Sequence, residues 1–177
     1  IAQLCTQATM TNDPKLALRP WKCFGSIPPD QEVVNRINSD PIYGRDASYG
    51  ALGIDAAVAD FKPTIWVGSD DIWSFPLAAY CDKPWYKRLH GIHHVTVDSL
   101  PVLDQAFEQA RRSKHYLTWA PFAAREMKRV GGESMAHVGS IWGAMDTAAF
   151  SPIDPKVRAD LRRQFGITPD TVVFLFV

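Results

Sequence analysis

Residues 91–132 read GIHHVTVDSLPVLDQAFEQARRSKHYLTWAPFAAREMKRVGG, and this stretch decides the fold. The apolar and β-branched residues from Gly91 to Val97 predict a strand, and His115 to Thr118 predict another. Between them, apolar residues recur at helical spacing over 102–113. Pro121 opens a second helix, which ends at two glycines. Strands and helices that alternate in this way form parallel βαβ units.

The alternation continues upstream and downstream of this stretch. Residues 49–61 predict a helix that Pro63 ends, and 64–67 predict a strand. On the other side, 137–141 predict a strand, and a helix follows from Pro155 to a cap at Gly166. We therefore expect an α/β fold with a Rossmann-like, doubly wound parallel sheet. Its neighbouring central strands are expected at 65–67, 95–97 and 115–117.

The two ends of the chain are less regular. Residues 1–29 contain four breaking prolines, and in the rest of 1–48 we expect only a short helix over 31–38, capped by Asp30, and a loop over 41–49. The apolar run Thr171–Val177 predicts a strand buried on both faces, which would need neighbours on both sides. We expect the chain to be a fragment whose next lobe begins at this strand.

The composition excludes several classes of protein. The chain has 177 residues, of which 46% are hydrophobic and 21% charged, as in globular proteins. Nineteen basic residues balance nineteen acidic ones, which argues against a nucleic-acid-binding role. No apolar run is long enough for a transmembrane segment. The three cysteines form no CxxC motif, and we read them as reduced thiols in a cytoplasmic protein.

The common catalytic motifs are absent from the sequence. There is no GxGxxG, P-loop or HExxH motif, and the serine of Gly139–Gly143 is not central as a nucleophile elbow requires. His93 and His94 are adjacent on a predicted strand, so they point to opposite faces, one into the core and one to the surface. The sequence also lacks the DxD triplet with which one large class of sugar transferases holds its metal. No metal site is therefore predicted.

The candidate site residues follow the predicted strands, because ligands of open parallel sheets bind beyond the carboxyl ends of the strands. Asp98 and Ser99 follow one strand, and we expect Asp98 to be the catalytic carboxylate; the alternative is a cap for the next helix. Asp70, Asp71 and Trp73 follow another strand, where carboxylates beside an aromatic ring suit a sugar. The alternative is a solvated loop with a core tryptophan. A third strand ends at Thr118, which we also place at the substrate.

Several segments resemble group 1 (family 4) glycosyltransferases. The stretch KPTIWVGSDDIW, residues 62–73, is similar to the family's "kPDvvi…D.W" strand and loop, and HVTVDSLP, residues 94–101, also resembles that lobe. MDTAAFSP, residues 145–152, looks like the interlobe signature "GvDt..F.P". RADLRRQFGI, residues 158–167, looks like the helix "R..lr..lGi" that opens the C-terminal lobe, and 172–177 resembles that lobe's first strand. Gly143 and Ala144 replace the usual His and Gly before the signature, and the cleft histidine of many members falls near Asp98.

The resemblance implies the GT-B fold of two facing Rossmann-like lobes. Residues 1–48 would be the start of the first lobe without its first strand, 49–145 its acceptor-binding part, and 146–177 the linker and start of the donor lobe. The implied activity is sugar transfer from a nucleotide-sugar to a glycan, lipid-linked or protein acceptor. It would retain configuration and need neither metal nor cofactor, with the nucleotide-sugar as co-substrate. The alternatives are a non-catalytic GT-B-like binding or scaffolding module and a nucleotide-sugar epimerase of the same shape. Oligomerisation stays open.

Overall fold

A computed structural model of the chain describes residues 1–144, 146–149 and 151–173. The chain divides into two compact units, 1–142 and 143–177, which we treat separately. The domain boundary expected between 145 and 146 touches residue 145, which lies outside the described residues. Among the described residues, no helix is long and apolar enough to cross a membrane.

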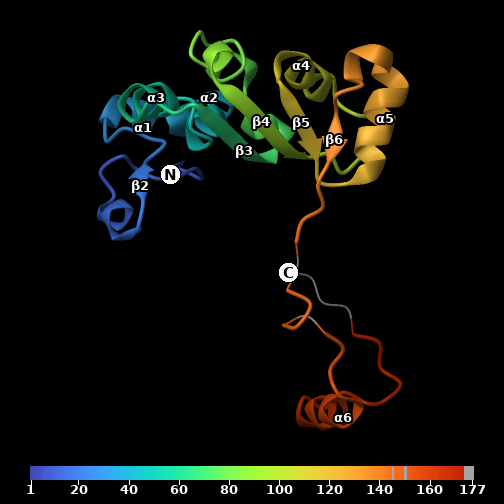
Figure 1. Ribbon diagram of the computed structural model, residues 1–177. Coiled ribbons are helices and arrows are strands. Elements are labelled where there is room, and N and C mark those ends of the chain that lie inside the picture. The colour runs from blue at the N-terminus through green and yellow to red at the C-terminus, as the bar shows by residue number, and fades with distance from the viewer. Residues whose placement is uncertain (145, 150, 174–177) are drawn as a thin grey trace. The chain divides into compact units, whose positions relative to one another are not determined.

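The centre of the first unit is a four-stranded parallel sheet in the order β3-β4-β5-β6 (Figure 1). Its strands are β3 (Ile65–Asp71), β4 (His90–Thr96), β5 (His115–Thr118) and β6 (Gly139–Ser140). All three strand pairs are parallel, so the predicted parallel α/β class is confirmed. The order contains no reversal among the described strands, so this sheet is wound in one direction and not doubly wound.

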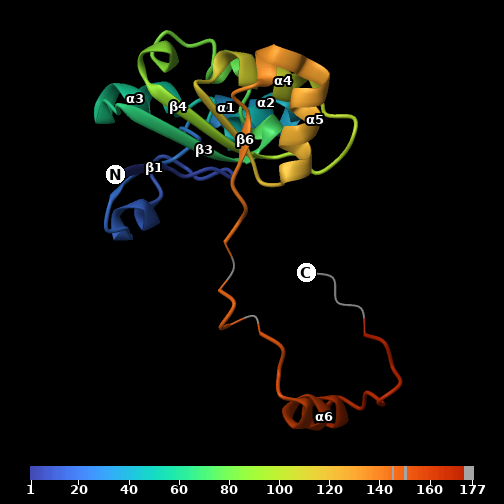
Figure 2. The same cartoon turned by 45° about the vertical axis from the view of Figure 1, so that its right-hand side comes forward.

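Two helices connect the last three strands. They are α4 (Asp104–Arg112) and α5 (Pro121–Gly131), and they lie on the same face of the sheet, as right-handed crossovers in one direction require (Figures 1 and 2). In α4, the buried residues include Ala106, Phe107 and Ala110, the apolar face that the sequence predicts. Glu108 and Arg112 form an i,i+4 ion pair on its exposed face. The short 3₁₀ helix η5 (Gly132–Met135) then leads to β6.

The connection between β3 and β4 breaks the alternation of strands and helices. It contains only three 3₁₀ helices, η2 (Ile72–Ser74), η3 (Leu77–Ala79) and η4 (Tyr86–Arg88). β3 also runs four residues beyond its predicted end at Val67. The run that begins at Gly68 suggests a loop, but Gly68 lies within the strand, where its missing side chain leaves room for the Trp66 ring. A Cβ at this position would lie 2.1 Å from the Trp66 ring.

The amino-terminal part forms a separate pair of parallel strands, β1 (Ala2–Leu4) and β2 (Lys22–Phe24), joined through the 3₁₀ helix η1 (Pro14–Leu18). The helices α1 (Gln31–Ser39), α2 (Pro41–Ser48) and α3 (Ile54–Phe61) follow. The expected loop over 41–49 was wrong, because the Asp40 carboxylate caps α2 by accepting hydrogen bonds from the Ile42 and Tyr43 N–H groups. α3 starts five residues later than predicted because Gly50, with a φ of +95°, begins a turn.

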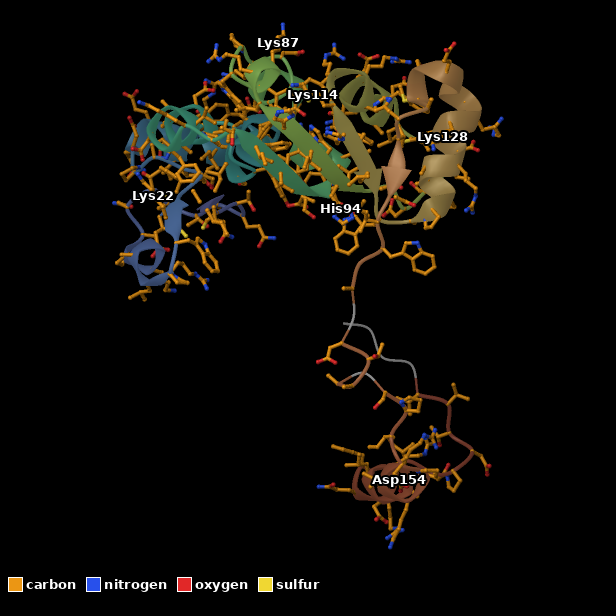
Figure 3. The ribbon with its side chains drawn as sticks, viewed as in Figure 1. Lys22, Lys87, His94, Lys114, Lys128 and Asp154 are labelled. Carbon is orange, nitrogen blue, oxygen red and sulfur yellow. The ribbon has the colours of Figure 1, made fainter. Side chains whose placement is uncertain are left out.

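The second unit contains one helix, α6 (Pro155–Gln164), among its described residues. The Asp154 carboxylate caps it through the Lys156 and Val157 N–H groups (Figure 3). Gly166 follows with the positive φ expected of a carboxyl-terminal cap. Of the last predicted strand, 171–173 are irregular, and 174–177 lie outside the described residues.

The core of the first unit is an aromatic cluster around His93. The ring of this histidine is fully buried among Trp66, Phe75, Tyr86 and Tyr116. Its Nε2 lies 3.5 Å from the Cys81 Sγ, while Nδ1 has no described partner. Burial lowers the pKa of His93 to about 3 and raises that of Cys81 to about 11, so both groups are neutral at pH 7. They form a structural pair and not a thiolate–imidazolium nucleophile.

The lowered pKa of His93 predicts a loss of stability in mild acid. Below pH 6.5 the unfolded chain binds a proton at this histidine and the folded chain does not, down to about pH 3. The free energy of unfolding should therefore fall by about 1.4 kcal/mol per pH unit in this range. Urea unfolding between pH 6 and 4 should show this slope in the wild type and its removal in His93→Phe. The exposed-site variant His90→Gln should keep it; an unchanged slope in His93→Phe would contradict the assignment.

Candidate functional site

The candidate site is a small pocket at the carboxyl ends of β3 and β4. It measures about 110 Å³, and four of the predicted site residues line it: Asp71, Trp73, Asp98 and Ser99. In the register of the two strands, Asp71 pairs with Thr96, so Asp98 lies two residues beyond the last pair. The parallel pairing therefore brings together residues that are 27 positions apart in sequence.

Side chains of α4 hold the loop that carries Trp73 through hydrogen bonds. The Gln109 Nε2 donates hydrogen bonds to the Ile72 and Phe75 carbonyl oxygens, at 2.6 and 2.9 Å. The Gln105 Nε2 is a second donor to the Ile72 oxygen, at 3.0 Å, and the Tyr116 hydroxyl donates to the Gln109 Oε1 at 3.0 Å. Because Gln109 is fully buried, these bonds fix η2 against the core. Gln109 was not predicted from the sequence, in which it stands out only as a polar residue on the apolar face of α4.

Tyr49 is a further candidate residue that the sequence analysis did not identify. Its ring packs edge-on against Trp73 with the centroids 4.8 Å apart. Its backbone oxygen accepts a hydrogen bond of 2.6 Å from the Tyr80 hydroxyl, which anchors this part of the chain. Desolvation, with the nearby charges of Asp70 and Asp71, raises the pKa of the Tyr49 hydroxyl. Tyr49 is therefore a neutral hydroxyl donor beside two carboxylates at neutral pH.

Asp70 and Asp71 line two different cavities. Asp70 lines a larger cavity of about 600 Å³ at the free edge of β3, while Asp71 lines the small pocket. The Asp70 Oδ1 also accepts a hydrogen bond of 2.8 Å from the Asp71 N–H. Neither residue lies in a solvated loop, because both belong to the strand.

Asp98 is not a helix cap. The helix expected from 102 begins at Asp104, and its cap position is Leu103, which makes no side-chain capping bond. Asp98 is exposed and has no described hydrogen bond. The alternative of a capping role is therefore wrong.

Thr118 lies apart from the pocket. It is fully buried at the end of β5, and its hydroxyl donates to the Ala120 carbonyl oxygen at 2.8 Å.

His94 lies on the other face of the sheet, opposite α4 and α5 (Figure 3). His94 Nε2 lies 2.9 Å from the Ile141 carbonyl oxygen, so it donates, and Nδ1 is left to accept from Ser69 at 3.3 Å. The prediction that the two histidines point to opposite faces is confirmed: His93 lies in the core, and His94 is half-buried on the other face.

The pocket offers groups that can bind the hydroxyl groups at one edge of a ligand. Two carboxylates, a serine and a tryptophan offer acceptors, a donor and an apolar surface. Sites that enclose a small ligand usually measure about 300–1,000 Å³. This pocket is smaller, so it has room for one edge of a ligand whose remainder lies outside it. In the part of the chain that the structure describes, no three His, Cys, Asp or Glu side chains cluster as metal ligands.

Comparison of the chain with known proteins adds no relative to this description. No protein-family model matches it, and neither a curated protein nor a solved structure does.

Proposed function

We propose that this chain is the acceptor-side lobe of a retaining, metal-independent glycosyltransferase with the GT-B fold. The observation that carries the proposal is the convergence of Asp71, Trp73, Asp98 and Ser99 on one pocket at the carboxyl ends of two parallel strands. Open parallel sheets bind their ligands at this edge. The resemblance of residues 49–177 to family 4 glycosyltransferases, in the order and spacing of several segments, points to the same activity.

Three residues of the pocket have a defined role in this proposal. The Asp98 and Asp71 carboxylates accept hydrogen bonds from hydroxyl groups of the sugar, and Trp73 packs against its C–H surface. Transfer forms a bond between the anomeric carbon and the oxygen of an acceptor hydroxyl as the bond to the nucleotide phosphate breaks, and the hydroxyl proton passes to the leaving phosphate. The Asp98 carboxylate, held near the anomeric carbon, stabilises the positive charge that develops there. The nucleotide itself would bind to the donor lobe.

The proposal is tested by release of nucleotide from a panel of nucleotide-sugars, using the polypeptide that carries both lobes. We expect one donor to be consumed in the presence of acceptor glycans, with a rate that EDTA leaves unchanged. A complete loss on chelation that a divalent ion restores would contradict the metal-independent mechanism. If no donor is consumed and sugars still bind, the chain is a binding module and the proposed transfer is wrong.

A further inference from the structure

Two of the three cysteines lie on neighbouring strands of the amino-terminal sheet. Cys23 belongs to β2, where it pairs with Gln3 of β1, and Cys5 follows β1 by one residue. The Cys5 N–H donates a hydrogen bond of 2.7 Å to the Phe24 carbonyl oxygen, so the parallel pairing continues to this residue. Along the paired strands, Cys5 is therefore offset from Cys23 by two residues.

Both cysteine side chains lie on one face of this sheet. Alternation places Gln3 and Cys5 on the same face of one strand, and Trp21 and Cys23 on the same face of the other. The Trp21 Nε1 donates to the Gln3 Oε1 at 3.0 Å, so the two faces are one. Desolvation, followed by the neighbouring Cys23 thiol, raises the pKa of Cys5. The strand pairing thus brings the two thiols next to each other.

The pair is accessible to small reagents. Cys5 and Cys23 are free, half-buried thiols, and Cys23 lines an open cavity of about 440 Å³ together with Asp13 and Arg19. This volume lies in the range of about 300–1,000 Å³ that is usual for small-ligand sites. Cys81 is different, because it is buried in the core beside His93. A reagent in solution therefore reaches the pair and not Cys81.

We propose that Cys5 and Cys23 are a site of reversible oxidation, at which a low-molecular-weight disulfide converts the two thiols into a disulfide bond. Cysteines that oxidise reversibly are accessible and have a second thiol beside them, which displaces the reagent from the first. Of the three cysteines, only this pair has both features. The inference does not depend on sugar transfer.

Two exchange steps make up the reaction with glutathione disulfide. The Cys23 thiolate, which lines the cavity, attacks one sulfur of the reagent. The S–S bond of the reagent breaks, and the first glutathione leaves as a thiolate that takes up a proton. The Cys5 thiolate then displaces the second glutathione from Cys23, and the bond between the two Sγ atoms forms. The chain loses two electrons and two protons in all, which the two glutathione thiols carry away.

Peptide mapping without reduction tests the inference on the full chain. The chain is equilibrated with equal concentrations of reduced and oxidised glutathione, and the remaining thiols are then alkylated. Trypsin cleaves after Lys15 and Lys22, so the bond appears as peptide 1–15 joined to peptide 23–36. We expect this joined pair to be the main oxidised product and to disappear with dithiothreitol. Its equilibrium constant should be at least about 10-fold larger in the native chain than in urea, because folding holds the two thiols together.

Serine variants supply the controls. Cys81→Ser should give the joined peptides in wild-type yield, because Cys81 lies in the core. Cys5→Ser should give no joined peptides and should leave glutathione attached to Cys23. Separate glutathione adducts on the two cysteines of the wild-type chain, or a bond that includes Cys81, would overturn the proposal. Equal equilibrium constants in the native chain and in urea would overturn it as well, because the fold would then contribute nothing to the pairing.

Discussion

Replacing Asp98 by asparagine should lower kcat of the proposed two-lobed glycosyltransferase by roughly 10- to 1,000-fold while leaving its thermal midpoint nearly unchanged. The side chain keeps its shape and loses its charge, so an effect confined to turnover would come from electrostatic stabilisation. Because Asp98 is exposed, is not a helix cap and has no described hydrogen bond, the folded state should lose little. Initial rates at saturating donor and acceptor, with thermal unfolding of the same samples, measure both quantities.

The matched control for this substitution is Asp104→Asn. Asp104 is an exposed carboxylate at the start of α4, six residues from Asp98, and it does not line the pocket. It should retain wild-type turnover. Wild-type turnover in Asp98→Asn, or an equal loss in both variants, would end the claim that Asp98 acts on the transition state.

The largest effect on stability is expected at Gln109. Gln109→Leu removes the donor to the Ile72 and Phe75 carbonyl oxygens and the acceptor of the Tyr116 hydroxyl. Each buried group that is left without a partner costs about 1–3 kcal/mol, so the free energy of unfolding should fall by about 3–5 kcal/mol. Because the same bonds hold η2, Trp73 should also become more mobile. Urea unfolding and the fluorescence anisotropy of the tryptophans follow the two effects.

Gln105→Leu is the comparison for this prediction. Gln105 donates to the same Ile72 oxygen but is only partly buried, and Gln109 still satisfies that oxygen without it. We expect a loss of about 1 kcal/mol or less. Similar losses in the two variants would show that the buried network contributes no more than a surface hydrogen bond.

The sequence predicted the parts of the fold in which apolar periodicity is strong. β5 was predicted to the residue, α5 to within one residue, and the apolar face of α4 correctly, because alternation at the periods of strands and helices marks them directly. The loop predicted over 41–49 is a helix because Asp40 and Pro41 form a start signal that outweighs the weak periodicity after it. Gly68 within β3 could not be foreseen, since its reason is the position of the Trp66 ring.

The candidate site was predictable in its position and not in its details. Asp71, Trp73, Asp98 and Ser99 were placed together by one rule, that loops after parallel strands meet at one edge. Tyr49 packs edge-on against the Trp73 ring, and Gln109 donates hydrogen bonds to carbonyl oxygens. Both are tertiary contacts, which leave no pattern in the neighbouring sequence. Thr118 follows the same rule but is turned into the core, because its side chain points to the face of β5 that the helices cover.

The proposed sugar transfer is tested most directly by the anomeric configuration of the product. Proton NMR of a reaction containing the two-lobed protein, its preferred nucleotide-sugar and an acceptor glycan follows the anomeric signal of the first product. The account predicts a new glycosidic anomeric proton with the configuration of the donor, formed in the presence of EDTA and reduced together with kcat in Asp98→Asn. A product of inverted configuration, or donor that stays intact with every acceptor, would contradict it.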